Sequence, residues 1–179
     1  MQHIMVDLES LDTVPGAVIL SLGAVFFDET GLGDEFYKVI LRSSCEAAGM
    51  TVSQDTLNWW SKQSIDASQV LRDAEIAPDS LADVLNQFND FLKRDKGVKV
   101  WGNGADFDNS LLAVAYRRAG VKQGWLPYNG RCYRTLKNIA ANVPAVARGG
   151  TYHNALDDAK TQANHAIEIY RQNPGLIWK

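Results

Sequence analysis

The sequence predicts one α/β domain in which helices flank a mixed sheet. Three β-rich segments follow one another with short loops, apolar residues then recur at helical spacing, and a short strand-like run stands between later helices. The chain has 179 residues, of which 46% are hydrophobic and 22% are charged, as in an ordinary globular domain with a sizeable core. We therefore expect a single domain over residues 1–179.

The N-terminal part of the sequence predicts an antiparallel meander. Residues 3–8 form a short apolar run, and residues 17–27 form a longer run rich in β-branched and aromatic residues. Residues 35–41 form a third such run, and the glycines within residues 28–34 predict a hairpin turn before it. Short loops between these runs favour antiparallel pairing of three strands.

The remaining chain predicts helices that alternate with one or two further strands. Ser80 and Asp83 form a capping box before a run of apolar residues at helical spacing. Such alternation is typical of parallel strands in an α/β domain. The predicted elements are a helix over 54–63 capped by Ser53, a helix after Ser80, a strand at 98–102, and helices at 108–119, 134–142 and 154–172.

The composition argues against several classes of protein. No run of roughly 18 apolar residues is present, which predicts no membrane span. The N-terminus lacks the pattern of a secretory signal, and Cys45 and Cys132 are too few for a disulfide framework or a zinc site. We expect a cytoplasmic protein with reduced thiols.

The net charge of −3 conceals an uneven distribution. Up to Asp108 the chain has 8 Lys and Arg against 18 Asp and Glu, whereas from Asn109 onward it has 10 against 3. This asymmetry favours an anionic partner for the C-terminal part, although solvated faces of unequal charge would give the same pattern.

Two acidic residues interrupt the first predicted strand, "HIMVDLES". Asp7 and Glu9 are two residues apart, so their side chains emerge on the same face, with Cα atoms about 6–7 Å apart. Buried ionised carboxylates need a partner, and neither Lys nor Arg is close in sequence. A divalent cation would neutralise them. The alternative is that one or both point to solvent at an edge strand.

A further acidic pair follows a predicted buried strand in "VWGNGADFDNSLL". The carboxyl ends of strands are where α/β proteins build their sites. Asp108 at the helix start lies over the inward-facing side, and Asp106 in the preceding loop competes for the same role. Either could instead simply cap the helix.

The C-terminal segment "GGTYHNALDDAKTQA" supplies a histidine and another acid. His153 precedes the last predicted helix, and Asp158 lies five residues later, so both can face one cavity. Gly149 and Gly150 predict a mobile loop around His153. His165 lies about 10 Å further along the helix axis, and we expect it to be structural.

Taken in order, these motifs resemble the DEDDh 3′–5′ exonucleases. Asp7 and Glu9 match the first motif, Phe107 and Asp108 the second, and His153 with Asp158 the third. In proofreading-type members the second motif is Asn-x-x-Phe-Asp, whereas this chain has one residue more and the additional Asp106 within it. The segments "WGNGADFDNSLL" and "TLNWWSKQS" resemble most closely a phage and bacterial subgroup of ribonuclease AS-like enzymes.

The resemblance implies an RNase H-like fold and a metal-dependent hydrolase. It implies two Mg²⁺ (or Mn²⁺) ions and a histidine base that removes nucleoside 5′-monophosphates from the 3′ end of single-stranded nucleic acid, with RNA slightly favoured over DNA. It also allows a homodimer. The implied metal ligands are Asp7, Glu9, Asp108 and Asp158, and the implied base is His153.

Several polar and aromatic residues are candidate substrate contacts. Trp59 and Trp60 are adjacent in a helix and point about 100° apart, so we expect one in the core and one free to stack on a base. The candidates are Ser10, Trp59, Trp60, Gln63, Asn103 and Arg134.

Two other functions fit part of the pattern. One is a catalytically silent nucleic-acid-binding or polymerase-associated, proofreading-type module, and the other is a small-molecule phosphoesterase that uses the same metals. Retention of all five site residues argues against a silent module. "GNGADF" lacks the last glycine of the dinucleotide-binding G-x-G-x-x-G motif, which argues against that function.

Overall fold

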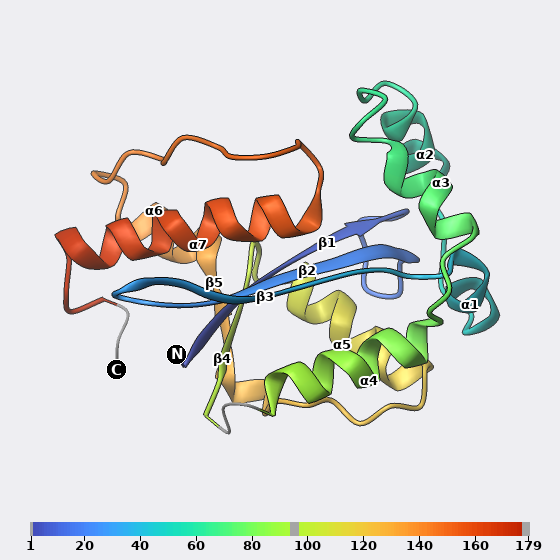
Figure 1. Ribbon diagram of the computed structural model, residues 1–179, viewed down its shortest axis with the longest axis horizontal. Coiled ribbons are helices and arrows are strands. Elements are labelled where there is room, and N and C mark those ends of the chain that lie inside the picture. Colours follow the sequence, from blue (N-terminus) through green and yellow to red (C-terminus); the bar gives the residue numbers. More distant parts are fainter. Residues whose placement is uncertain (1, 94–96, 177–179) are drawn as a thin grey trace.

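Five strands form one mixed sheet in the order β3-β2-β1-β4-β5 (Figure 1). The computed structural model describes residues 2–93 and 97–176, so residues 1, 94–96 and 177–179 of the expected domain lie outside the described residues. The antiparallel meander followed by parallel strands is confirmed. The strands are β1 (His3–Ser10), β2 (Ile19–Asp28), β3 (Gly31–Val39), β4 (Lys99–Gly102) and β5 (Gly130–Cys132).

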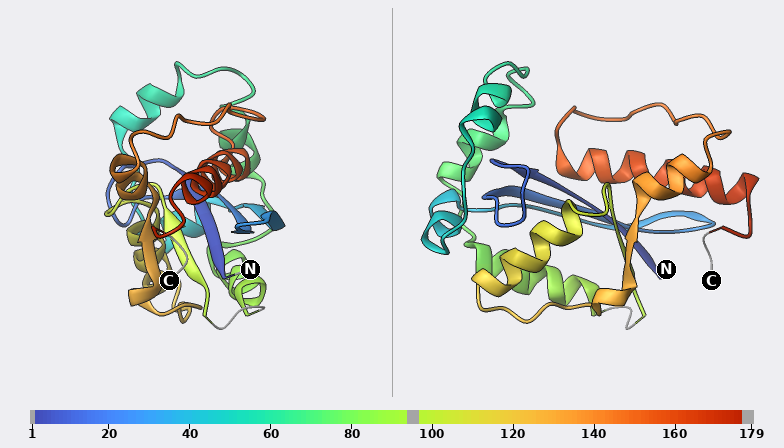
Figure 2. Two further views of the ribbon diagram at one scale, coloured as in Figure 1. Left: turned by 90° about the vertical axis from the view of Figure 1, so that its left-hand side faces the viewer. Right: turned by 180° about the vertical axis from the view of Figure 1, so that it is seen from behind.

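Helices cover both faces of the sheet. One face packs against α6 and α7 and the opposite face against α4 and α5, while α1, α2 and α3 gather at one end of the sheet (Figures 1 and 2). Within residues 2–93 and 97–176, no helix is long and apolar enough to cross a membrane. The helices are α1 (Arg42–Ala47), α2 (Gln54–Trp60), α3 (Gln69–Glu75), α4 (Leu81–Leu92), α5 (Asp108–Arg118), α6 (Tyr133–Ile139) and α7 (Ala155–Gln172), with a 3₁₀ turn at Pro127–Asn129.

The alternation of side chains along β1 assigns its residues to these two layers. Ile4, Val6 and Leu8 are buried in the cluster that includes α4 and α5. Met5 is buried in the other cluster, with α6 and α7. Because side chains alternate along a strand, Asp7 and Glu9 share the α7 face with Met5.

The strand register places the acidic residues at an edge of the sheet. Met5 pairs with Trp101, and β4 ends one residue later, at Gly102. Asp7 and Glu9 therefore extend beyond the carboxyl end of β4, where the chain turns toward α5. This is the position at which an α/β sheet leaves room for a ligand.

Some predicted boundaries were wrong. The turn expected over 28–34 is only two residues long, because the Asp28 carboxylate accepts hydrogen bonds from the Thr30 backbone N–H and hydroxyl at 2.9 and 2.6 Å. As a result, Asp28 pairs with Gly31. The third strand accordingly spans residues 31–39 rather than 35–41.

Two short helices were not predicted, and the second parallel strand was expected without a position. The helices α1 and α3 have six and seven residues and no side-chain cap, so the sequence carries little local signal for them. Burial of Cys45 in α1, and of Val70 and Ala74 in α3, holds them in place. The strand β5 has only three residues and exists because it pairs with β4.

Candidate active site

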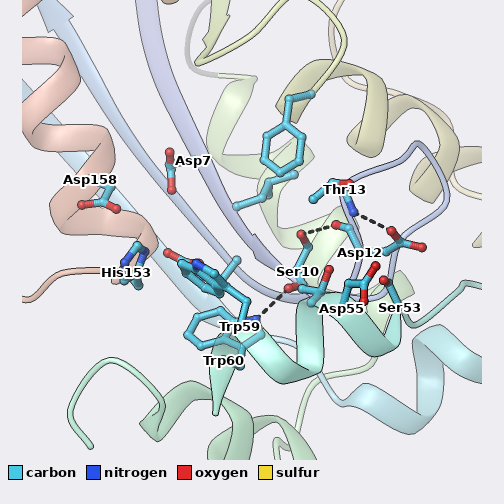
Figure 3. Close-up of a pocket in the computed structure, with 14 residues that line it drawn as sticks. Asp7, Ser10, Asp12, Thr13, Ser53, Asp55, Trp59, Trp60, His153 and Asp158 are labelled. Carbon is cyan, nitrogen blue, oxygen red and sulfur yellow. Dashed lines mark hydrogen bonds between the residues drawn. The ribbon is translucent and has the colours of Figure 1, made fainter. Parts of the chain in front are cut away.

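Acidic side chains from β1, α5 and α7 meet at the edge of the sheet. One ligand-capable atom from each of Glu9, His153 and Asp158 lies within 4.8 Å of the other two. Asp7 lines the same cleft, at the same end as Asp158 in Figure 3. The third motif therefore lies beside the first, although the two are separated by most of the chain.

A glycine in β2 allows this close approach. Gly23 pairs with Asp7, and a Cβ atom built on Gly23 would lie 2.2 Å from the backbone of Ala155 and Leu156. A larger residue would push the first turn of α7 away from the sheet. Gly23 therefore sets the distance between Asp158 and the acidic residues of β1.

Asp108 is fully buried at the start of α5. Its Oδ2 accepts a hydrogen bond from the Asn103 backbone N–H at 2.6 Å. A Cβ atom on Gly102 would lie 2.9 Å from the Asp108 Cβ, so the glycine makes room for this side chain. In the described part of the chain, the buried Asp108 Oδ1 has no hydrogen-bond partner. Asp106, by contrast, is exposed.

Burial dominates the electrostatics of these acids. It raises the pKa of Asp7 well above its usual value, and the nearby charges of Asp108 and Glu9 add to the effect. Burial also raises the pKa of Glu9 to about 8, although the Arg148 guanidinium opposes the shift. The pKa of Asp108 rises to about 6 for the same reason, opposed by the Asn103 N–H. The cluster thus resists full ionisation unless a cation enters it.

Two partners of this cluster were missed at the sequence level. Gln162 donates a hydrogen bond from Nε2 to Asp7 Oδ1 at 2.7 Å, and Arg148 forms an ion pair with Asp158. Gln162 lies four residues after Asp158 on one helix, so its spacing carried a usable signal. Arg148 lies in a loop, and a loop contact has no periodicity from which the sequence could predict its pairing with Asp158.

His153 stands between the acids and the two tryptophans. Its ring lies 4.8 Å from the Trp59 ring and 6.1 Å from the Trp60 ring, measured between centroids. Burial lowers its pKa, and the charge of Arg148 lowers it further, so the neutral ring is favoured. His165 instead lies in the core, where its Nδ1 is 2.7 Å from the Tyr133 hydroxyl, consistent with a structural role.

The acids open into a cleft of about 520 Å³. Asp7, Asp158 and His153 lie at one end of the cleft, and Trp59 and Trp60 lie in the middle (Figure 3). Polar residues from loops and a helix start form the other end, which we call the polar end. Trp60 is 1% exposed and donates its indole N–H to the Ser10 carbonyl at 3.0 Å, whereas Trp59 is 42% exposed. The residues at the polar end are Ser10, Asp12, Thr13, Ser53, Asp55 and Thr56.

Three candidate substrate contacts do not line this cleft. Gln63 donates its side-chain N–H to the Trp59 carbonyl at 3.0 Å. The Asn103 backbone supports Asp108, as described above, and Arg134 is exposed in the first turn of α6. Five residues of the polar end (Asp12, Thr13, Ser53, Asp55 and Thr56) were not among the sequence candidates, because they lie in loops and a helix start that the fold alone brings together.

Comparison with known proteins gives one family. Residues 2–170 match the model of the family described as the 3′-5′ exoribonuclease Rv2179c-like domain. No curated protein sequence matches the chain.

Solved structures have a similar fold at low sequence identity. The nuclease domain of 3′hExo, a DEDDh family member bound to rAMP, is 16% identical over 97% of this chain and 94% of that chain, with a TM-score of 0.67. Exonuclease X in complex with 5′ overhanging duplex DNA is 12% identical over 99% of this chain and 94% of that chain, with a TM-score of 0.60. Pop2p of S. pombe, in a form with Mg²⁺ and Mn²⁺ bound, is 13% identical over 96% of this chain and 84% of that chain, with a TM-score of 0.59. The chain therefore has the RNase H-like exonuclease fold.

Proposed function

Because the chain belongs to the 3′-5′ exoribonuclease Rv2179c-like domain family, we propose that it removes nucleoside 5′-monophosphates from the 3′ end of single-stranded RNA, with DNA as a weaker substrate. The observation that carries this proposal is a cluster of four acids beside an exposed tryptophan: Asp7, Glu9 and Asp158 line one end of the cleft with Trp59. The fourth, Asp108, is buried, and its charge helps to raise the pKa of Asp7 and Glu9. We take residues 1–179 to be a single exonuclease domain, and its assignment to a ribonuclease AS-like subgroup stays a prediction.

The chemistry of the cluster fits divalent cations. Carboxylate oxygens are the ligands that Mg²⁺ and Mn²⁺ prefer. The raised pKa values of Asp7 and Glu9 and the unpartnered Asp108 Oδ1 are the features of a site in which the carboxylates outnumber the nearby cationic side chains. We assign two ions to Asp7, Glu9, Asp108 and Asp158. When bound, such ions stabilise the charge that develops on the attacking and leaving oxygens of a phosphodiester.

His153 is the proposed general base. Its neutral ring can accept the proton of the attacking water, and the rings of Trp59 and Trp60 hold it at the mouth of the acidic cluster. The lowered pKa keeps the accepting form populated at neutral pH.

Replacing this base is expected to affect turnover and not binding. We expect His153→Ala to lower kcat by about 10²–10⁴-fold, the usual contribution of a general base, while Mn²⁺ affinity measured by calorimetry stays unchanged. Tyr152→Phe, on the same loop, serves as the control. Wild-type turnover in His153→Ala would exclude the role.

Trp59 is the proposed platform for the terminal base. It is exposed in the cleft beside His153, whereas Trp60 is held in the core by its bond to Ser10. Aromatic stacking contributes about 1–3 kcal/mol per base in single-strand binding proteins. The acceptor oxygens of Asp12 and Asp55 at the polar end are suited to a ribose hydroxyl, which supports the preference for RNA.

We expect Trp59→Ala to raise KM for oligonucleotides by about 10-fold, which corresponds to about 1.4 kcal/mol of lost stacking. Trp59→Phe should also lose most of the fluorescence quenching that a short oligonucleotide causes. Trp125→Phe, in the buried core, should keep it. Unchanged KM and quenching in both Trp59 variants would contradict the platform.

The remaining substrate candidates receive narrower roles. Arg134 is exposed near the loop after β4, and its charge acts on the Asp108 carboxyl, so we assign it to a phosphate upstream of the scissile bond. Gln63 and Asn103 support Trp59 and Asp108 through the hydrogen bonds given above. We also propose that the protein forms a homodimer and is located in the cytoplasm, where Cys45 and Cys132 stay reduced. Both thiols are free in the structure.

An end-labelled oligonucleotide assay tests the function. With a 5′ label, single-stranded RNA in Mg²⁺ should give a ladder that shortens from the 3′ end, DNA should be cut more slowly, and EDTA should stop both. Binding without degradation would favour the silent module. Degradation that persists in EDTA would exclude the metal-dependent mechanism.

A further inference from the structure

The loop that carries His153, residues 149–154, is held in an unusual backbone conformation. His153 has a φ of +60°, in the left-handed region that non-glycine residues rarely occupy. Such a conformation persists only where surrounding contacts enforce it. The side chain of His153 can face the acids only while these contacts hold.

Asp157, in the first turn of α7, makes one of these contacts. Its Oδ2 accepts a hydrogen bond from the Thr151 backbone N–H at 2.8 Å. The carboxylate also lies against Gly150, because a Cβ atom on Gly150 would be 2.1 Å from the same oxygen. Gly150 has a φ of +74°, so both the space and the backbone angle require glycine. The loop backbone thus rests directly on the Asp157 carboxylate.

Asn154 fixes the other end of the loop. Its Oδ1 accepts hydrogen bonds from the Leu156 and Asp157 backbone N–H groups at 3.1 and 3.2 Å, as an N-cap. His153 is therefore one of the two residues between two anchored points, Thr151 and Asn154. A displacement of Thr151 would be taken up by the backbone angles of the residues between them.

We propose that Asp157 is a positioning residue for His153, acting through the Thr151 N–H and not through its charge. This inference rests on the proposed role of His153 as the base. It differs from the ordinary use of an acid in the first turn of a helix, which stabilises the helix dipole by charge and moves no loop. The two roles make different predictions for an uncharged residue that still offers an acceptor oxygen.

The pair Asp157→Ala and Asp157→Asn separates these roles. Asp157→Ala removes the acceptor and should lower kcat by about 10–100-fold, with KM within about twofold of wild type, because small displacements of a reacting group carry costs of this size. Asp157→Asn keeps an acceptor oxygen and should stay within about threefold of wild-type kcat. Equal losses in the two variants, or full activity of Asp157→Ala, would overturn the proposal.

Lys160→Ala is the matched control on the same helix. Lys160 is one turn further along α7, lines the same side cavity as Gly150 and Asp157, and forms an ion pair with Glu35 at 2.7 Å. It does not bind the loop backbone, so its loss should leave kcat unchanged.

If Asp157→Ala does not fold, Gly150→Ala tests the same contact from the other side and should reproduce the loss of kcat. Wild-type kcat in Gly150→Ala would overturn the proposal.

A double variant and a spectroscopic readout separate this inference from the function it rests on. If Asp157 acts through His153, His153→Ala with Asp157→Ala should be no slower than His153→Ala alone, and additive losses would overturn the proposal. If His153→Ala alone keeps wild-type activity, the base role fails, and positioning is then judged by histidine ring NMR. The His153 ring signals should shift in Asp157→Ala and not in Asp157→Asn, with His3 and His165 as references. Unmoved His153 signals would overturn the positioning role.

Discussion

Asp7→Asn is expected to abolish hydrolysis and to make the metal-free protein more stable. Asp7 is a proposed metal ligand whose pKa is raised well above its usual value by burial and by the charges of Asp108 and Glu9. The asparagine keeps an oxygen for the Gln162 hydrogen bond but carries no charge. We expect kcat to fall by at least about 10³-fold, equivalent to about 4 kcal/mol of transition-state stabilisation.

The thermal stability of the same variant provides the second half of this test. Without metal, the Tm of Asp7→Asn should be higher than that of the wild type. The increase should be about 2–4 °C for each kcal/mol by which the loss of the buried charge stabilises the folded state. Asp106→Asn is the matched control, since Asp106 is exposed in the loop before Asp108, and neither kcat nor Tm should change. An active Asp7→Asn, or one that unfolds at a lower temperature, would contradict the assignment.

The stability of the metal-free protein is expected to fall as the pH rises from about 5 to 8. The pKa of Glu9 is about 8 in the folded protein, against 4.5 for an unperturbed glutamate, and that of Asp108 is about 6 against 3.8. Between these values the folded state binds more protons than the unfolded state, so deprotonation removes stability, by up to about 1.4 kcal/mol per pH unit for each group. This stabilising contribution of the protonated groups is complete below their pKa values in the unfolded state. It is lost as the pH rises through their pKa values in the folded state.

Melting curves at several pH values, in EDTA and in Mg²⁺, measure this effect. In EDTA the Tm should decrease toward pH 8, and Mg²⁺ should raise it most at pH 8, where the ligands are ionised. Glu9→Gln should flatten the profile in EDTA, whereas Glu29→Gln, in the exposed β2–β3 turn, should not. A Tm in EDTA that rises from pH 5 to pH 8 would refute this interpretation.

Much of the fold could be predicted because its long elements carry their own periodicity. The alternation in β1 and the capping box of α4 are local signals, and the structure has both, with Ser80 and Asp83 capping α4 as expected. The helices α1 and α3 and the strand β5 lack such signals, since they are stabilised by burial or by pairing with distant residues. Tertiary contacts decide whether elements as short as these form.

The candidate site divides in the same way. The order of the motifs and their resemblance to the DEDDh exonucleases selected Asp7, Glu9, Asp108, His153 and Asp158, and their roles stay predictions. The structure places four of these five residues, all but Asp108, along one cleft. The ion pair of Arg148 with Asp158 and the polar end of the cleft depend on loops that meet only in space. Gly150 shows a further difference: its sequence context suggested mobility, whereas the structure places it against the Asp157 carboxylate.

If the acids of β1, α5 and α7 hold the catalytic cations, a crystal soaked in Mn²⁺ should show these ions directly. Anomalous difference density should show two peaks, within ligand distance of Asp7, Glu9, Asp108 and Asp158, and Asp7→Asn crystals should lose at least one of them. Peaks elsewhere on the molecule, or no peak at this cluster at saturating Mn²⁺, would contradict this assignment.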